Sequence, residues 1–253
     1  MSLLQKASRL PSVARDGWRY PALRMRARGV ESAVGVLRGL GFATDELEAA
    51  ARDFDTLAPG LYAQLAERAR QGGSEVAETR ASGHSDSSEE GKRLLYLSVR
   101  VLRPQLLAET GPFNGASTAF LLRALEDNGA GRLLTFDLQE ATDALGIPLP
   151  AGQQPAWLVP DELRPRLELV LGDTRRTLGP RLRDAGKLDL FFHDSLHTAR
   201  HMLFEFRAAW RHLRPGGVLL ADDVFWNPAF WAFTRFHRVP FRHIGTIGAT
   251  RKG

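Results

Sequence analysis

The stretches LDLFFHDSLH (188–197) and GGVLLADDV (216–224) decide the fold of this 253-residue chain. Each is a short aliphatic run that stops on acids, Asp194 in the first and Asp222-Asp223 in the second. In an open parallel sheet, ligands bind outside the carboxyl ends of the strands. If both runs are strands of one such sheet, three carboxylates and the His197 imidazole meet at one edge. Three close carboxylates repel one another unless a cation holds them, so the pattern indicates a metal site beside a base, and hence an enzyme.

Apolar strands alternate with helical segments from about residue 105 onward. The expected strands cover 105–110, 132–137, 166–173, 188–194 and 218–223. The expected helices between them cover 115–129, 174–186 and 197–217. This alternation predicts a parallel sheet with helices on both faces. A helix over 229–238 and two short strands, 239–244 and 246–252, complete the predicted domain.

The chain divides into a helical extension, 1–84, and a main domain, 85–253. Helices are expected over 43–54 and 61–73, and no strand signal is clear in this part. Residues 138–165 fit no element, because they are rich in Pro and Gly. A loop of this length is usually functional or disordered.

The composition restricts the class of protein. There are no cysteines, which excludes disulfides and thiolate metal sites. No apolar run approaches the length of about 18 residues that a membrane span needs, and the first residues lack the apolar segment of a signal peptide. We therefore expect a cytoplasmic protein. The net charge of +5 permits a polyanion partner, but no cluster of basic and aromatic residues appears, so nucleic acid is not favoured.

A glycine-bearing loop, ETGPFNGAST (109–118), follows the first predicted strand and opens a helix. Glycines let the backbone approach a ligand closely, and a helix N-terminus offers free N–H groups. The spacing differs from G-x-G-x-x-G and no P-loop lysine follows, which argues against a dinucleotide or a nucleoside triphosphate. A plain strand-to-helix turn is the alternative interpretation.

Two further acids end the next two predicted strands. Asp137 can accept the hydroxyls of a ribose, as acids at this position do in nucleotide-binding α/β folds. Asp173 is placed either to contact an adenine amino group or to cap the following helix. With the glycine loop, these acids indicate an adenosyl ligand that has no pyrophosphate.

On these motifs, residues 85–253 resemble a class I S-adenosylmethionine-dependent methyltransferase. The resemblance implies a Rossmann-like fold with a mostly parallel seven-stranded sheet. ETGPFNGAST resembles the family's E-x-G-x-x-x-G-x-S-T cofactor loop, and SSEEGKRLL (87–95) resembles the entry helix of the O-methyltransferase branch. The match is closest to the metal-dependent O-methyltransferases of the catechol, sugar and macrolide types. The phrase FFHDSLHT…PGGVLLADDV is also similar to a large bacterial group of the methyltransferase-24 kind, whose substrates are usually unassigned.

The resemblance implies a role for individual residues. The cofactor-binding set is Glu109, Gly111, Phe113, Asn114, Gly115, Ser117, Thr118, Asp137, Asp173 and Asp194. Mg²⁺ would be held by Asp194, Asp222 and Asp223, and His197 would be the general base, three residues after the first metal-binding Asp. The chain departs from the family pattern at Pro112, where Thr is common, and in the length of 138–165.

The expected reaction is O-methylation of a hydroxyl on a small molecule. A divalent cation lowers the pKa of a bound hydroxyl, and Mg²⁺ suits a site made of oxygens. A histidine, with an ordinary pKa of about 6.5, can take the proton near neutral pH. The candidate acceptor contacts are Trp226 and Asn227, with Trp157 as a lid or a cover for the adenine.

Several alternatives stay open. One is a metal-independent methyltransferase acting on nitrogen, carbon or a carboxylate, in which Asp222-Asp223 are structural. Another is a non-catalytic binding protein on the same fold. His197 has a plain interpretation as a surface residue, and His193 and His201 are interpreted as packing or surface residues. The N-terminal helices either pair two copies as a homodimer, which we favour, or cover the site.

Overall fold

The computed structural model describes residues 32–73, 89–142 and 148–253. Its centre is a seven-stranded sheet of order β3-β2-β1-β4-β5-β7-β6. The strands are β1 (Leu106–Thr110), β2 (Arg132–Asp137), β3 (Leu167–Leu171), β4 (Leu188–His193), β5 (Leu213–Ala221), β6 (Arg242–Ile244) and β7 (Ile247–Arg251). β1 to β5 run parallel, and β7 lies antiparallel between β5 and β6. The predicted sheet is confirmed.

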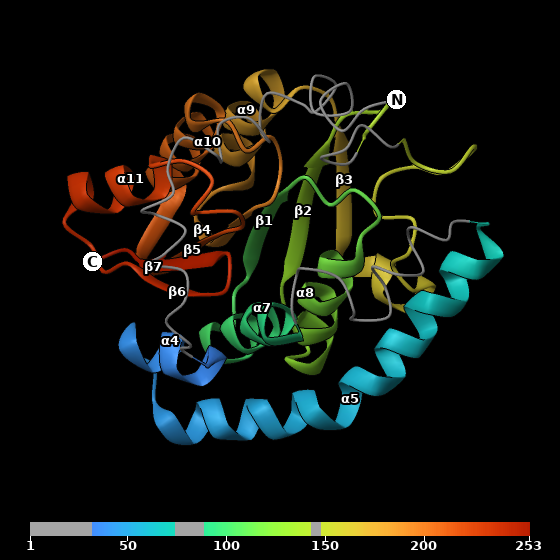
Figure 1. The fold of residues 1–253 in the computed structure, drawn as a ribbon, viewed down its shortest axis with the longest axis horizontal. Coiled ribbons are helices and arrows are strands. Elements are labelled where there is room, and N and C mark those ends of the chain that lie inside the picture. The colour runs from blue at the N-terminus through green and yellow to red at the C-terminus, as the bar shows by residue number, and fades with distance from the viewer. Residues whose placement is uncertain (1–31, 74–88, 143–147) are drawn as a thin grey trace, which may run out of the picture.

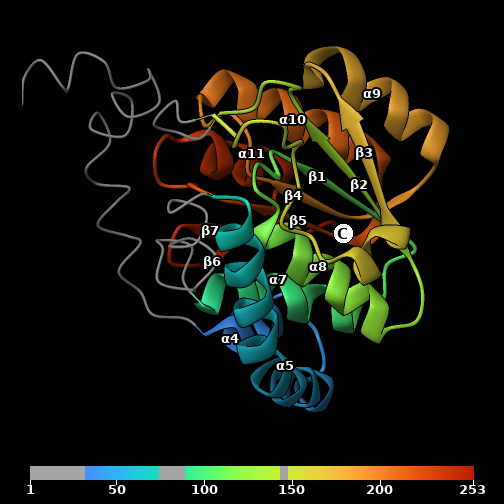
Figure 2. The same cartoon turned by 90° about the vertical axis from the view of Figure 1, so that its right-hand side faces the viewer.

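Helices cover both faces of the sheet (Figures 1 and 2). One face carries α4 (Ala33–Gly39), α5 (Thr44–Gln71), α7 (Glu89–Leu102) and α8 (Ala116–Asp127), and the other carries α9 (Thr174–Ala185), α10 (Ala199–His212) and α11 (Ala229–His237). Successive strand residues point to opposite faces, so Val218 and Leu220 of β5 join the first core, and Leu219 and Ala221 join the second. Two covered faces explain why these strands are apolar throughout.

The N-terminal helices share a core with the sheet. The sequence predicts separate helices over 43–54 and 61–73, but α5 is one helix of 28 residues that contains Pro59. A proline inside a helix costs about 3 kcal/mol. Here it is offset by a stripe of apolar residues at helical spacing, which stays buried along the whole helix: Leu47, Ala50, Phe54, Ala58, Leu61, Leu65 and Ala69. The predicted boundary at 84/85 lies outside the described residues, as does the extension before residue 32.

The junction of α10 and β5 differs from the prediction. The helix expected to reach residue 217 ends at His212, and Pro215-Gly216-Gly217 belongs to the strand. Gly216 has a φ of +78°, and a Cβ on Gly217 would lie 2.9 Å from the Asp189 carbonyl oxygen. The glycines therefore allow β5 to bend against β4, where the register shifts. The sequence signal for a helix stop is in fact a strand bend.

The described part of the long loop packs onto the domain. Ala156, Leu158 and Val159 are buried in the same core as α8, and a short 3₁₀ helix, η1 (Asp161–Arg166), leads into β3. Residues 143–147 lie outside the described part. None of the helices in the described segments combines the length and the apolarity that a membrane crossing requires.

Candidate active site

The loops that follow the parallel strands lie against one another at the carboxyl edge of the sheet. The strand ladder continues one residue past the strands: Gly111 N donates to Phe136 O at 2.9 Å, and Asp194 N donates to Thr110 O at 2.9 Å. Asp222 N likewise donates to the His193 carbonyl at 2.8 Å. The acids that end these runs therefore gather at one edge, as the sequence predicts.

Two positions in the loop after β1 need glycine, because the backbone of neighbouring loops leaves no room for a Cβ. Gly111 has a φ of +79°, and a Cβ there would lie 2.3 Å from the Asp194 carbonyl oxygen. Gly115 has a φ of +90°, and its Cβ would lie 2.6 Å from Ala156 Cα. Both positions need glycine for conformation and for space. The β1 loop thus packs directly on the β4 loop, and contact of these glycines with a cofactor stays a prediction.

Glu109 is a buried carboxylate with one oxygen in use. Its Oε2 accepts hydrogen bonds from the Thr118 and Thr135 hydroxyls, both at 2.8 Å. Burial raises the pKa of Glu109 to about 7 against the effect of these donors. Its Oε1 is buried and has no hydrogen-bond partner among the described residues. An unsatisfied buried acceptor needs an explanation, and the amine of an S-adenosylmethionine is a donor of the right kind.

Asp137 lies between β2 and the glycine loop. Its carboxylate accepts from Phe113 N at 3.0 Å and from Leu138 N at 2.8 Å. Burial raises the pKa of Asp137 to about 6, although both backbone donors oppose the rise. The side chain lies at the end of β2, where a ribose-binding acid is predicted, and ribose binding stays a prediction.

Asn114 joins the β1 loop to the long loop. Its Oδ1 accepts from Trp157 Nε1 at 2.9 Å, and its carbonyl accepts from Leu158 N at 2.9 Å. Phe113, at a φ of +44°, accepts from Ala156 N at 2.7 Å. These bonds hold residues 156–158 against the predicted cofactor loop. Trp157 is buried in the core, and its role as a lid stays a prediction.

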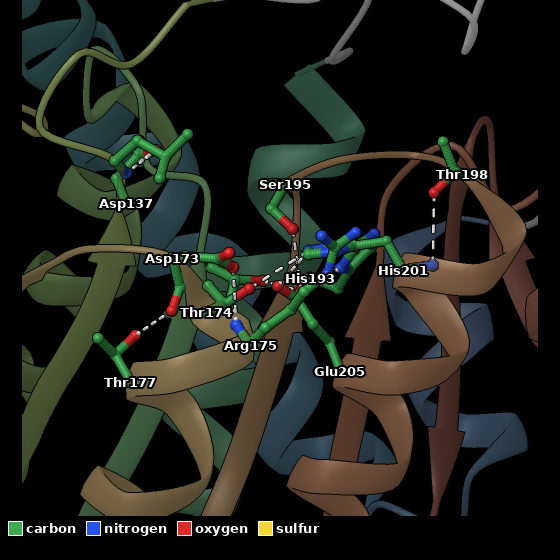
Figure 3. Close-up of polar contacts among 12 residues, drawn as sticks. Asp137, Asp173, Thr174, Arg175, Thr177, His193, Ser195, Thr198, His201 and Glu205 are labelled. Carbon is green, nitrogen blue, oxygen red and sulfur yellow. Dashed lines mark hydrogen bonds and ion pairs between the residues drawn. The ribbon is translucent and has the colours of Figure 1, made fainter.

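The other predicted cofactor residues lie close by. Thr118 is in the first turn of α8 and bonds Glu109, and Ser117 precedes it. Asp173 is the N-cap of α9, where its side chain accepts from Arg175 N at 2.9 Å (Figure 3). The capping interpretation of Asp173 therefore holds, and an adenine contact stays a prediction.

His197 lies between two carboxylates. Its Nε2 is 3.7 Å from Asp194 Oδ1, and its Nδ1 is 3.8 Å from Asp223 Oδ2. The residue is only 8% exposed, so it is not a surface histidine. Burial lowers the pKa of His197 to about 3, and the neighbouring His193 adds to this effect. The imidazole is therefore neutral near pH 7, which is the form that accepts a proton.

One of the predicted metal ligands, Asp222, uses one carboxylate oxygen in other contacts. Asp222 Oδ1 accepts from Thr246 Oγ1 at 2.6 Å and from Asp223 N at 2.8 Å, and Asp223 has a φ of +52°. The described segments contain no group of three side chains that could hold a metal ion. Binding of Mg²⁺ by Asp194, Asp222 and Asp223 stays a prediction.

Lys92 of α7 brings a positive charge toward the same carboxylates. Its side chain is 1% exposed, and burial lowers its pKa to about 8 while Asp194 and Asp222 act in the opposite direction. Its ammonium lies 5.6 Å from the centre of the Tyr62 ring. Lys92 therefore offsets part of the negative charge that the sequence assigns to a divalent cation.

The segment after Asp223 supports His197. Asn227 is buried, and its Nδ2 donates to the His197 carbonyl at 3.0 Å, while its Oδ1 accepts from Ala229 N at 2.9 Å. The Trp226 ring lies 6.3 Å from the His197 ring, centre to centre. Both residues are thus beside the candidate base, and contact with an acceptor stays a prediction.

A buried cluster around Glu205 is missing from the sequence prediction. The Glu205 carboxylate binds the rings of His193 at 2.7 Å and His201 at 2.8 Å, and Figure 3 shows it reaching from α10 toward them. Both histidines are buried partners of one acid, and neither is a surface residue. The available signal was a Glu on the apolar face of α10, between Met202 and Phe206.

Comparison with known proteins gives the family. Residues 108–224 match the model of a methyltransferase domain family, Methyltransf_24. A putative O-methyltransferase from Klebsiella pneumoniae is similar with a TM-score of 0.55 and 18% identity, over 81% of this chain and 96% of that one. The O-methyltransferase TomG from Streptomyces achromogenes gives 0.51 and 19%, over 76% and 90%. An O-methyltransferase from Bacillus cereus gives 0.51 and 20%, over 81% and 100%.

No curated protein matches the chain by sequence. Because their sequence identities to this chain are 18–20%, the solved structures establish the fold alone. The family model identifies the domain as a methyltransferase. The strand order is that of the same fold. The family prediction is confirmed for residues 108–224, which form a class I S-adenosylmethionine-dependent methyltransferase domain.

Proposed function

We propose that the protein transfers the methyl group of S-adenosylmethionine to a hydroxyl oxygen of a small molecule, with His197 as general base. The observation that carries the proposal is the neutral, buried imidazole between Asp194 and Asp223. The neighbours named above are O-methyltransferases by description, and TomG takes part in tomaymycin synthesis. These similarities support oxygen as the methyl acceptor here.

Methyl transfer is an in-line displacement. When bound, S-adenosylmethionine supplies a methyl group made electrophilic by its sulfonium. The acceptor oxygen forms the new C–O bond as the C–S bond breaks, the electron pair of that bond stays on sulfur, and the hydroxyl proton passes to His197. In this scheme Glu109 receives the donors of the cofactor amine, and Asp137 receives the ribose hydroxyls. Holding both partners in line is itself a large part of catalysis.

Burial and the flanking acids act on His197 in opposite directions: a pKa of about 3 keeps the ring neutral but makes it a weak base, and the acids favour its protonated form. The low pKa keeps the ring neutral before the reaction. Once the ring is protonated, Asp194 and Asp223 lie on its two sides at 3.7 and 3.8 Å and favour the cation. General-base help of this kind contributes about 10²–10⁴ in rate.

The proposed scheme does not include Mg²⁺, and the experiment below tests whether the reaction depends on it. One oxygen of Asp222 accepts hydrogen bonds from Thr246 and from backbone, and the charge of Lys92 interacts with Asp194 and Asp222. The chain's own groups therefore account for proton removal in the scheme above. Residues Trp226 and Asn227 are proposed to border the acceptor, because they adjoin His197.

The test is an acceptor panel. The protein is incubated with methyl-labelled S-adenosylmethionine and with phenols, catechols and sugars, in EDTA and in added Mg²⁺, and the products are identified by mass spectrometry. We expect a labelled methyl ether whose yield is the same in both conditions. A product methylated only on nitrogen, carbon or a carboxylate contradicts the oxygen acceptor. A yield abolished by EDTA and restored by Mg²⁺ contradicts the metal-free scheme.

A further inference from the structure

We propose that Glu205 is a positioning residue for methyl transfer, which fixes the loop that carries His197. The proposal rests on the proposed function, because it assigns Glu205 its part through the candidate base. It concerns a buried acid that has no role in the scheme above.

Four donors converge on the Glu205 carboxylate. Oε2 accepts from Thr110 Oγ1 at 2.6 Å, from His193 Nδ1 at 2.7 Å and from Ser195 Oγ at 2.9 Å. Oε1 binds His201 Nε2 at 2.8 Å. The donors come from the end of β1, the end of β4, the loop after β4 and α10 itself, so one side chain ties these segments together (Figure 3).

The surroundings of the Glu205 carboxylate favour its ionised form although it is fully buried. Burial alone would raise the pKa of Glu205, but the hydrogen bonds and charges of His193 and His201 outweigh burial and hold the pKa well below its usual range. Hydrogen bonds to an ionised acceptor are roughly twice as strong as neutral ones. An apolar side chain would fill this layer at less desolvation cost, so the acid is better explained by what it positions.

The bonds of Glu205 bracket the loop that leads to His197. They hold His193 before Asp194 and Ser195 after it, and Asp194 N is held in turn by the Thr110 carbonyl at 2.9 Å. The His193 ring meets the His197 ring edge to face, with centres 5.3 Å apart and planes at 78°. The Glu205 carboxylate therefore fixes both the backbone approach and one wall of the candidate base.

A matched control lies at the other end of β4. Asp189 is also buried, and it accepts from Gln105 N at 2.8 Å and Leu106 N at 2.9 Å as well as from Arg214. It is a structural carboxylate near the amino end of β4, whereas Glu205 reaches the carboxyl end of that strand from α10. Asp189→Asn therefore measures what is lost when a buried, bonded carboxylate of this sheet loses its charge.

The experiment compares Glu205→Gln with Asp189→Asn. The amide keeps the size of the side chain but offers one acceptor oxygen where three donors now meet. We expect ¹⁵N–¹H spectra to show shifted imidazole signals for both His193 and His197 in Glu205→Gln. S-adenosylhomocysteine affinity should stay within about threefold, since Glu109 and Asp137 are held separately. With the acceptor that the panel identifies, kcat should fall by about 10²-fold, the effect of a misplacement near 1 Å, while KM for S-adenosylmethionine changes little.

Several outcomes of this experiment would overturn the proposal for Glu205. Unchanged His197 signals and unchanged kcat in a folded Glu205→Gln overturn the proposal, as does the same split between kcat and KM in Asp189→Asn. If Glu205→Gln does not fold, Ser195→Ala removes a single donor and should still shift the His197 signals; if it does not, the proposal fails. The spectra can be recorded without an acceptor. If the wild-type protein shows no methyl transfer, the proposed function fails, but the spectra still report whether Glu205 fixes the position of His197.

Discussion

The two ends of strand β4 hold buried polar groups in opposite conditions. At the amino end, both Asp189 oxygens are used by backbone amides and Arg214. At the carboxyl end, buried Glu109 Oε1, His193 Nε2 and His197 Nε2 have no hydrogen-bond partner among the described residues. Buried polar atoms are normally satisfied. At the amino edge of the sheet, the buried carboxylate is fully hydrogen-bonded within the protein. At the carboxyl edge, buried polar atoms remain that a ligand could hydrogen-bond.

The largest expected effect comes from removing the candidate base. His197→Gln should lower kcat by about 10²–10⁴, because a neutral amide cannot take the acceptor proton. Initial rates of methyl transfer measure this, and S-adenosylhomocysteine affinity checks that the cofactor site survives. His212→Gln, at the end of α10 that leads into the amino end of β5, is the control and should leave kcat within about twofold. A full rate in His197→Gln would remove the base from the scheme.

The next effect concerns the glycines at the two edges. Gly111→Ala places a Cβ 2.3 Å from the Asp194 carbonyl oxygen at a φ of +79°. We expect a loss of about 2–5 kcal/mol in the free energy of unfolding, from left-handed strain together with overpacking. Gly129→Ala has a φ of +67° and no atom within 4 Å, so about 1–2 kcal/mol should be lost. Urea denaturation measures both, and equal losses would refute the close packing of the β1 and β4 loops.

Breaking the amino edge should affect stability without affecting catalysis. Asp189→Asn removes the charge that Gln105 N, Leu106 N and Arg214 share. We expect a loss of about 1–3 kcal/mol in the free energy of unfolding, with kcat within about twofold of the wild type. A large fall in kcat in a stable variant would mean that the two edges do not divide function from structure.

The smallest effect is the pH dependence of cofactor binding. Burial raises the pKa of Asp137 to about 6, and ribose hydroxyls donate to the ionised form. At pH 5 most molecules carry the protonated acid and at pH 8 nearly all are ionised, so S-adenosylhomocysteine should bind about tenfold more weakly at pH 5. The figure of about tenfold is the contribution of Asp137 alone, and Glu109, with a pKa raised to about 7, weakens binding at pH 5 further. Calorimetry across this range measures the slope, and Asp137→Asn should bind weakly with a reduced slope. Tighter binding at pH 5 than at pH 8 would contradict the assignment of ionised carboxylates to the bound state.

Much of the fold was predictable because its signals are local. Fully apolar runs separated by helical segments indicated the parallel sheet, and five of its strands lie where the runs predict. The errors fell at Pro59 and at Pro215-Gly216-Gly217. There, residues that usually end a helix are accommodated by burial along α5 or by a bend in β5. At both places, tertiary packing outweighs the local tendency of these residues to end a helix.

The candidate site was only partly predictable. The sequence brought His197, Asp194 and Asp223 together, since all follow strands that end at one edge. It proposed a cation among the acids, whereas Asp222 is bonded to Thr246 and Lys92 arrives from α7. Thr246 lies in a segment that carries no motif, and the entry-helix motif that contains Lys92 gave no sign of a contact with the acids.

By itself, the sequence determined the fold class, the family and the edge of the sheet where the chemistry lies. These follow from periodicity and from where each apolar run stops. Only the tertiary structure decided which side chains share a hydrogen bond: Glu205 meets Thr110 from 95 positions away. The reason is physical, because a buried carboxylate takes whichever donors the packed layers bring to it, and that choice depends on three dimensions.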